Sequence, residues 1–314
     1  MRAMITTVTM NASLDKAYFM CDVIKNGTVM RVDACKTSAG GKGINVARAA
    51  TLCGAKVLAT GLVGGYNGQQ LESLLDKDGI PYQFCHIEGE TRCCINILDE
   101  GYGSTEYLEP GCEVSPLEEQ QFMKIFPDVI RESDVVAISG SLPRGVKKDI
   151  YGQMIAIAKD MGKIVILDTS GETLKRGIAA CPTMVKPNQE EIEQLFGVKI
   201  CSESDMIRYA QEIHDTGVQY VVISLGKDGA LLVCDDGVFQ GTPPKVETVN
   251  TVGCGDSMTG AFAAALERKY AAKDALKYAV AVATASAMSP NTGAFEPEKC
   301  GELLEQIEIR RKTL

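Results

Sequence analysis

An aspartate at the start of a predicted helix has the surroundings that best suit catalysis. Asp256 ends the segment Val252-Gly253-Cys254-Gly255-Asp256, and an apolar helical run, 258–267, follows it. Glycines let the backbone approach a ligand closely, and the free N–H groups and dipole of a helix start attract anions. A carboxylate beside that anion site could accept the proton of a hydroxyl that attacks a phosphoryl group. The alternative is an Asp that only caps the helix, and this segment alone leaves both interpretations open.

A second glycine-rich turn offers groups that bind phosphate or hydroxyls. The segment Ser38-Ala39-Gly40-Gly41-Lys42-Gly43-Ile44-Asn45 joins an extended run to a helix, and it carries Lys42 and Asn45 as candidate ligands. It matches neither the phosphate-binding pattern G-x-x-x-x-G-K-[ST] nor the dinucleotide pattern G-x-G-x-x-G. By itself the turn does not identify a ligand.

Three further turns follow predicted buried strands, at the edge where open parallel sheets bind ligands. In one of them, Asn188 and Glu191 could supply oxygen ligands to Mg²⁺, directly or through water. Their spacing also fits a helix-capping arrangement, so both interpretations stay open. The last turn, which contains Gly226 and Gly229, also fits a plain hairpin. The three segments are Ser139-Gly140-Ser141-Leu142-Pro143, Lys186-Pro187-Asn188-Gln189-Glu190-Glu191 and Ser224-Leu225-Gly226-Lys227-Asp228-Gly229.

The composition argues against several other functions. The net charge is −9 and no segment concentrates Lys and Arg, which argues against a nucleic-acid-binding surface. The two histidines, His86 and His214, do not sit in polar, glycine-rich turns, which argues against a histidine triad or a multi-histidine metal site. The 12 cysteines form no C-x-x-C pair, which favours reduced thiols that act as small apolar side chains. No segment resembles a signal peptide and no apolar run approaches about 20 residues, so we expect a cytoplasmic protein without a membrane partner.

The elements that must position these turns alternate along the chain. Apolar runs at 5–10, 56–63, 134–138, 164–168, 183–186 and 220–224 lack clean alternation, which predicts strands buried on both faces. Helical patterns at 44–53, 69–78, 118–131 and 149–161 lie between them, and the chain from 255 onward is mostly helical. Strand–helix alternation predicts an α/β fold, with a mostly parallel sheet between two helical layers.

Two stretches interrupt this rhythm. Residues 15–38 and about 92–109 alternate apolar and polar residues, as in Thr28-Val29-Met30-Arg31-Val32-Asp33 and Cys93-Cys94-Ile95-Asn96-Ile97-Leu98. Alternation predicts a sheet with one exposed face. We interpret both stretches as strands of a small β-sheet lid inserted into one domain that spans residues 1–314.

Taken together, these motifs resemble those of the ribokinase-like sugar kinases. The similarity is to the phosphofructokinase-B branch, which contains tagatose-6-phosphate kinases and 1-phosphofructokinases, and it runs from Thr6 to about Gly293. Seven motifs occur in the family's order: N-x-x-x-D, A-G-G-K-G-x-N, G-E-T-R, S-G-S-L-P, K-P-N-x-x-E, S-L-G-x-x-G and V-G-x-G-D-S. The resemblance implies a ribokinase-like three-layer α/β/α fold and a kinase that uses ATP and Mg²⁺.

The resemblance also implies roles for individual residues. Asp256 would be the catalytic base, beside an anion hole formed by the amides of Gly253, Cys254 and Gly255. Glu191 would bind Mg²⁺, directly or through water. Sugar hydroxyls would contact Asp15, Gly41 and Asn45, and the substrate's phosphate would contact Lys25, Lys42 and Arg92, with Ser141 nearby. The nucleotide would contact Lys186, Asn188, Ser224, Gly226, Gly229, Val280 and Thr284.

The sequence departs from the family pattern at two positions. Ala12 stands where the family usually has Pro, which removes a stiff residue but no hydrogen-bonding group. Cys254 stands where Ala or Ser is usual, and its small side chain keeps the backbone geometry. Our hypothesis is that oxidation of Cys254 crowds the phosphoryl site and inhibits the enzyme. Activity that is retained after peroxide has modified Cys254 would dismiss this hypothesis.

The resemblance implies a kinase that converts a ketohexose monophosphate to a bisphosphate. The segments 58–65, Gly89-Glu90-Thr91-Arg92 and 165–168 resemble tagatose-6-phosphate kinases, which favours tagatose 6-phosphate as substrate. Thr251-Val252-Gly253 and Glu113-Val114-Ser115-Pro116 look more like 1-phosphofructokinases, which would act on fructose 1-phosphate. A catalytically inactive sugar-phosphate-binding regulator and an NAD-dependent dehydrogenase are the alternatives of other classes. By family analogy alone, the lid sheets of two chains would pair in a homodimer.

Overall fold

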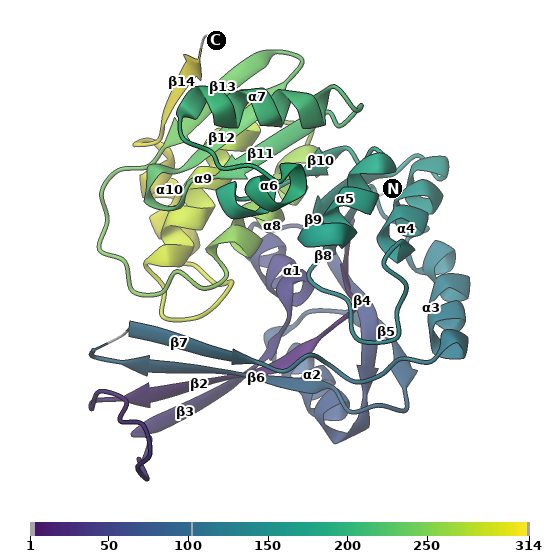
Figure 1. Ribbon diagram of the computed structural model, residues 1–314, viewed down its shortest axis with the longest axis vertical. Helices are drawn as coiled ribbons and strands as arrows, with labels where there is room; N and C mark the ends of the chain where they lie inside the picture. Colours follow the sequence, from purple (N-terminus) through teal and green to yellow (C-terminus); the bar gives the residue numbers. More distant parts are fainter. Residues whose placement is uncertain (1–3, 102, 313–314) are drawn as a thin grey trace.

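The computed structural model describes residues 4–101 and 103–312, which form two sheets (Figure 1). The larger sheet has ten strands in the order β14-β13-β12-β11-β10-β9-β8-β1-β4-β5. The strands from β11 to β5 in this order are parallel, and β12, β13 and β14 extend the sheet antiparallel. The strand bounds are β1 (Ile5–Thr9), β4 (Val57–Gly64), β5 (Tyr82–Ile87), β8 (Val135–Ser139), β9 (Ile164–Asp168), β10 (Met184–Val185), β11 (Tyr220–Ser224), β12 (Ala230–Cys234), β13 (Gly237–Thr242) and β14 (Glu308–Lys312).

Helices cover both faces of the large sheet, and each face has its own apolar core. One core joins the sheet to α1, α2, α8, α9 and α10, and the other joins it to α3, α4, α5, α6 and α7. Burial on both sides explains why the central strands are nearly continuous runs of Val, Ile, Leu and Ala. The helix bounds are α1 (Lys42–Leu52), α2 (Gly65–Asp78), α3 (Pro116–Val129), α4 (Ile150–Asp160), α5 (Gly171–Ala179), α6 (Gln189–Phe196), α7 (Glu203–His214), α8 (Cys254–Glu267), α9 (Ala272–Ala287) and α10 (Pro297–Leu304).

The smaller sheet, which we call the lid sheet, has the strand order β3-β2-β6-β7. It projects to one side of the α/β body (Figure 1). Strand β2 pairs antiparallel with β3 and parallel with β6, and β6 pairs antiparallel with β7. This confirms the second sheet that the alternating patterns predict. Its bounds are β2 (Ser13–Met20), β3 (Ala34–Gly40), β6 (Arg92–Asp99) and β7 (Gly103–Leu108).

The structure corrects three details of these predictions. Residues 21–33 are an irregular loop between β2 and β3, so the alternating segment from Thr28 to Asp33 is not a strand. Its apolar residues have no packed face to alternate against, as the 96% exposure of Val29 shows. The predicted strand at 183–186 is reduced to Met184–Val185, and the mostly helical end of the chain adds an edge strand, β14. Within the described ranges, no helix has the length and hydropathy that a membrane crossing requires.

Candidate active site

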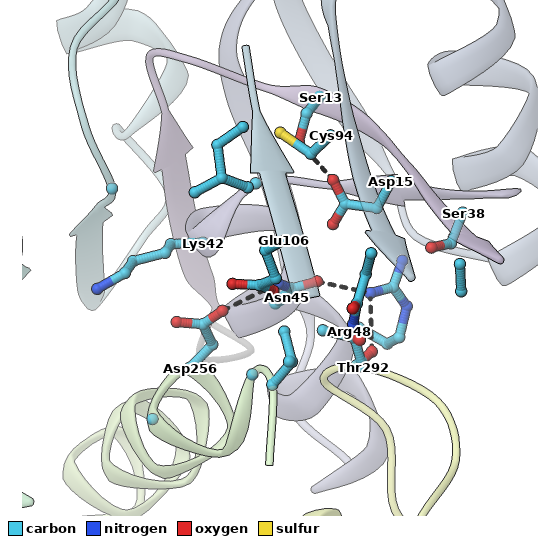
Figure 2. Close-up of a pocket in the computed structure, with 18 of the residues that line it drawn as sticks. Ser13, Asp15, Ser38, Lys42, Asn45, Arg48, Cys94, Glu106, Asp256 and Thr292 are labelled. Atoms are coloured by element: carbon cyan, nitrogen blue, oxygen red, sulfur yellow. Dashed lines mark hydrogen bonds between the residues drawn. The ribbon is translucent and has the colours of Figure 1, made fainter. Parts of the chain in front are cut away.

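A cavity of about 720 Å³ lies at the carboxyl ends of the central strands, and the lid sheet forms another of its walls (Figure 2). Its lining includes Thr9, Gly140, Thr169 and Lys186, which end or directly follow β1, β8, β9 and β10. Parallel strands place these ends at one edge of the sheet, so turns that are far apart in the sequence meet there. The cavity brings together thirteen predicted site residues: Asp15, Gly41, Lys42, Asn45, Arg92, Ser141, Lys186, Asn188, Glu191, Ser224, Gly253, Gly255 and Asp256.

Six predicted site residues do not line this cavity. Lys25 is exposed on the loop 21–33, and Cys254 is not among the residues that line the cavity. Gly226 and Gly229 lie in the short turn that joins β11 to β12, which is the hairpin named as the alternative. Val280 and Thr284 are buried inside the packed helix α9, where the Thr284 hydroxyl donates to the Val280 carbonyl at 2.7 Å. Their assignment to an adenine pocket therefore stays a prediction.

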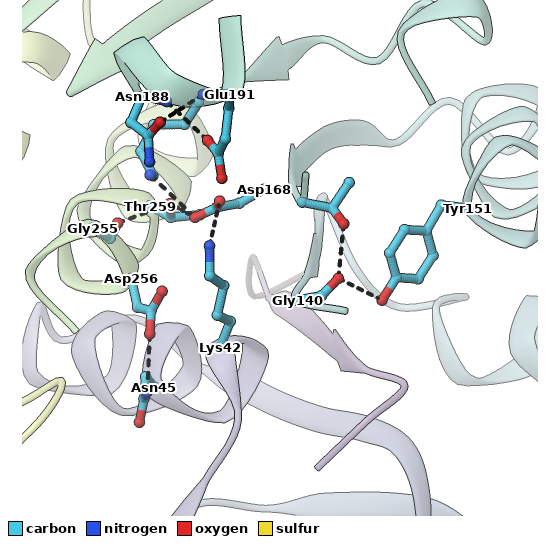
Figure 3. Close-up of polar contacts among 12 residues, drawn as sticks. Lys42, Asn45, Gly140, Tyr151, Asp168, Asn188, Glu191, Gly255, Asp256 and Thr259 are labelled. Carbon is cyan, nitrogen blue, oxygen red and sulfur yellow. Dashed lines mark hydrogen bonds and ion pairs between the residues drawn. The ribbon is translucent and has the colours of Figure 1, made fainter. Parts of the chain in front are cut away.

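Asp256 lies in the first turn of α8, and its carboxylate is buried. The helix start has no capping side chain, and Asp256 instead accepts a hydrogen bond of 2.9 Å from Asn45 Nδ2 (Figure 3). Burial raises the pKa of Asp256 to about 6, although Lys42 and the Asn45 hydrogen bond favour the ionised carboxylate. The capping interpretation is therefore wrong. A carboxylate whose pKa is this close to neutral pH suits a general base.

Of the three backbone amides that were predicted to form an anion hole, the Cys254 amide already has an acceptor. The N-cap, Gly253, has a φ of 81°, and an added Cβ would lie 2.7 Å from Thr292 Cγ2, so glycine is required there. The Cys254 amide donates to the Thr251 carbonyl at 3.3 Å. Among the described residues, the amides of Gly253 and Gly255 have no backbone acceptor and remain available to an anion.

Asp168, which the sequence analysis did not name as a site residue, links two lysines of the cavity. Its fully buried carboxylate lies 3.3 Å from Lys42 Nζ and 3.3 Å from Lys186 Nζ, and it accepts a 3.0 Å hydrogen bond from Thr259 (Figure 3). Burial would raise the pKa of Asp168, but the two lysines and Thr259 together lower it. Asp168 in turn raises the pKa of Lys42. Its signal in the sequence is an aspartate at the carboxyl end of a buried strand.

The lid sheet contributes a second carboxylate and an arginine. Asp15 accepts a 2.6 Å hydrogen bond from Ser13, and burial raises its pKa. Arg92 donates to the carbonyls of Glu109 at 2.8 Å and Asn11 at 3.0 Å. Its buried Nε has no hydrogen-bond partner within the described residues, which leaves a donor for a ligand.

Asn188 and Glu191 form the capping box of α6. The Glu191 amide donates to Asn188 Oδ1 at 2.8 Å, and the Asn188 amide donates to Glu191 Oε2 at 2.8 Å. Both residues also line the cavity. The capping interpretation is thus confirmed, and it still leaves the second carboxylate oxygen of Glu191 able to bind a metal or water.

The sequence model of the family described as "pfkB family carbohydrate kinase" matches residues 8–299. The chain belongs to this family. It is therefore a phosphotransferase that acts on a carbohydrate hydroxyl, and the dehydrogenase interpretation is wrong.

Relatives within the pfkB family match nearly the whole chain. A tagatose-6-phosphate kinase from Staphylococcus epidermidis is 36% identical over 310 residues, which are 98% of this chain and 99% of that protein. The solved phosphofructokinase-2 from Escherichia coli, in complex with potassium, has a TM-score of 0.91 at 32% identity, covering 98% and 99% of the two chains. A solved "possible 1-phosphofructokinase" from Thermotoga maritima has a TM-score of 0.90 at 27% identity, covering 99% and 100%. The predicted ribokinase-like fold is confirmed.

Arg48 and Glu106 are charged residues that line the cavity of this kinase and lie outside the seven sequence motifs. Arg48 follows Asn45 by one helical turn on α1, so a helical wheel would have placed both on one face. Glu106 lies on β7 opposite Asn96 of β6, and burial together with the charge of Asp15 raises its pKa. In the sequence, Glu106 is marked only by its place in the alternating stretch 92–109, which predicts a strand but not a site residue.

The hypothesis that oxidation of Cys254 inhibits this kinase has no support in the structure. Burial raises the pKa of Cys254 to about 11, so the thiol stays protonated at neutral pH. The thiolate is the form that oxidants attack, which makes Cys254 a poor target. Its side chain also lies outside the cavity, where Sγ approaches the Asn250 carbonyl at 3.7 Å.

Proposed function

We propose that this kinase transfers the γ-phosphoryl group of ATP to tagatose 6-phosphate and produces tagatose 1,6-bisphosphate. The observation that carries the proposal is the convergence, in one cavity, of Asp256 at a helix start with Asp15 and Arg92 of the lid sheet. The full-length similarity to a tagatose-6-phosphate kinase supports this choice of sugar.

On the sugar side of the cavity, we assign the polar side chains to the sugar hydroxyls and the basic side chains to the sugar phosphate. Asp15 and Asn45 bind hydroxyls, with Gly41 allowing close approach at a φ of 100°. Arg92 and Lys42 bind the phosphate that the sugar already carries, because a guanidinium can grip phosphate through parallel hydrogen bonds. Ser141 lies near the same wall, held by a 3.2 Å contact from Asn11 Nδ2.

On the nucleotide side, the proposal assigns Lys186, Asn188 and Ser224 to the ATP phosphates. Glu191 fits Mg²⁺, because it offers one free carboxylate oxygen, and this ion usually binds one or two carboxylates together with phosphates and waters. When bound, Mg²⁺ would neutralise charge on the transferring group. Among residues 4–101 and 103–312, no group of three or more His, Cys, Asp or Glu side chains is placed to hold a metal ion.

In the proposed chemical step, the protein positions the reacting groups and stabilises the negative charge of the transferring phosphoryl group. Asp256 removes the proton from the sugar hydroxyl as that oxygen attacks. The amides of Gly253 and Gly255 stabilise negative charge on the transferring group in a site that is already organised. Closure of the lid sheet excludes water, which would otherwise compete as acceptor.

The alternative substrate is fructose 1-phosphate. It is favoured by the 1-phosphofructokinase-like segments Thr251-Val252-Gly253 and Glu113-Val114-Ser115-Pro116, and by the Thermotoga structure. The proposal also includes a homodimer paired through lid sheets. Tyr107 and Leu108, which are 58% and 64% exposed on the edge strand β7, are apolar side chains that such pairing would cover. Sedimentation of the purified chain tests that arrangement, and a monomer at all concentrations would contradict it.

A coupled ADP-release assay tests the choice of substrate. The panel is tagatose 6-phosphate, fructose 1-phosphate, fructose 6-phosphate and unphosphorylated tagatose and fructose, each with Mg²⁺ and ATP. We expect the highest kcat/KM with tagatose 6-phosphate, and a large loss without the phosphate because Arg92 and Lys42 then lack their partner. A higher kcat/KM for fructose 1-phosphate would select the alternative. Equal use of unphosphorylated sugars would contradict the phosphate-binding assignment.

A further inference from the structure

Arg48 on α1 connects four parts of the molecule behind the sugar side of the cavity. Its guanidinium donates to Ala39 O at the end of β3 at 2.7 Å, and to Asp78 Oδ2 at the end of α2 at 3.1 Å. It also donates to Asn45 Oδ1 at 3.0 Å, and to Thr292 O in the loop before α10 at 3.4 Å. The side chain is only 13% exposed, so these contacts hold its position.

The contact with Asn45 fixes which way the Asn45 amide faces. An asparagine amide has one accepting oxygen and one donating nitrogen, which can exchange places by a half-turn. Arginine offers donors only, so it can bind the oxygen and not the nitrogen. The nitrogen is thereby directed to the opposite side, where it donates to Asp256 Oδ2 at 2.9 Å (Figure 2).

We propose that Arg48 is a positioning residue, which sets the orientation of Asn45 and through it holds the carboxylate of Asp256 ready to accept the proton of the substrate. Without Arg48, Asn45 can turn its oxygen toward Asp256 and disfavour the ionised carboxylate. This inference rests on the proposed function, because it concerns the same base.

Other charged groups also face Asp256 and must stay constant in any test. Lys42 from α1 and Lys186 after β10 favour its ionised form, whereas Asp168 at the end of β9 opposes it. Arg48 contacts none of these three side chains in the structure. Its effect on Asp256 through hydrogen bonds therefore passes through Asn45.

The test is a titration of Asp256 in the free protein. Aspartate carboxyl carbons are labelled with ¹³C and followed by NMR as the pH changes, and the Asp256 signal is the one missing from Asp256→Asn. The free protein is used because the sugar phosphate itself titrates near pH 6, as phosphomonoesters do, and would obscure a pH–rate profile. The variants are Arg48→Met, Arg48→Lys, which keeps a donor, and Arg48→Gln, whose amide both donates and accepts.

The matched control is Arg268→Met. Arg268 directly follows α8 and donates to the carbonyl of Cys53, which directly follows α1, so it joins the helices that carry Asp256 and Asn45 without touching Asn45. We expect the parent and Arg268→Met to titrate alike, near the value of about 6. In Arg48→Met and Arg48→Gln, Asp256 should titrate at higher pH than in the parent. In Arg48→Lys, the titration of Asp256 should return most of the way to that of the parent. In the ADP-release assay, Arg48→Met should lose about 10²-fold in kcat, the usual cost of a misplaced reacting group.

A purely structural role would give a different result. It would lower the amount of folded protein in Arg48→Met and Arg268→Met alike, and it would leave the Asp256 titration of the folded fraction unchanged. If Arg48→Met does not fold, Arg48→Gln decides. An unchanged titration in the folded Arg48 variants, or an equal shift in Arg268→Met, overturns the proposal. Absence of turnover with every sugar phosphate would contradict the proposed function instead, since the titration needs no substrate.

Discussion

Asp256→Asn is expected to lower kcat by about 10²–10⁴-fold, the range over which a positioned base contributes, while ATP still binds. Asparagine keeps the shape of the side chain but cannot take a proton from the attacking hydroxyl. The measurement is kcat in the ADP-release assay, with ATP affinity from calorimetry. A regulator that only binds sugar phosphate would show no change.

The same substitution should not destabilise the fold. The pKa of Asp256 is raised in the folded chain, so ionisation above a pH of about 6 costs folding free energy. This penalty is absent below the unfolded pKa near 3.8 and grows as pH rises through the folded value. Removing the charge should therefore leave Tm at pH 7 no lower than in the parent. The matched control is Asp274→Asn, an exposed aspartate in the first turn of α9, which should change neither property.

Asp168→Asn should be the most destabilising of the cavity substitutions, at about 3–5 kcal/mol, the usual cost of removing one partner from a buried ion pair. Lys186, which is 5% exposed, would keep its charge without the carboxylate that now lies 3.3 Å away. Denaturant unfolding at pH 7 measures the loss. We also expect about 10²-fold lower kcat/KM, because Lys42 and Lys186 would no longer be held in place.

Asp128→Asn is the control for Asp168, since Asp128 also pairs with a basic residue but on the surface, where it is 70% exposed. Loss of this surface ion pair should cost less than about 1 kcal/mol.

The contribution of Asp168 to folding stability should change with pH in the opposite direction to that of Asp256. The pKa of Asp168 is lowered on folding, so its contribution is present above the unfolded value near 3.8 and is lost as the pH falls through the folded value. A stability equal to the parent's in Asp168→Asn would contradict the buried-pair account.

The parts that the sequence predicted well depend on local spacing. The glycine turns before α1 and α8 can be recognised from the sequence, because the glycines and the start of the following helix lie within eight residues of each other. The buried strands can likewise be predicted from composition, because they are short apolar runs without clean alternation. The meeting of these turns in one cavity then follows from the parallel order of the strands.

The parts that were missed depend on distant partners. Asp168 looks like the end of an ordinary strand until folding brings Lys42, which is 126 positions away, against it. Arg48 is held in place by Ala39, Asp78 and Thr292, which lie on three other segments and are not adjacent to it in the sequence.

The loop 21–33 shows a different limit. Its alternating residues match a strand, but a strand also needs a neighbour to bond with, and the pattern alone does not supply one. The backbone bond from the Asp33 amide to the Phe19 carbonyl closes the loop instead, and it leaves Lys25 on the surface.

The most direct test of phosphoryl transfer to a sugar phosphate is a ³¹P NMR spectrum of the parent protein with Mg²⁺, ATP and tagatose 6-phosphate. The account predicts a second phosphomonoester signal on the sugar that grows in a one-to-one ratio with ADP, with little inorganic phosphate. ADP accompanied by an equal amount of inorganic phosphate, or no ADP with any ketohexose phosphate, would contradict it.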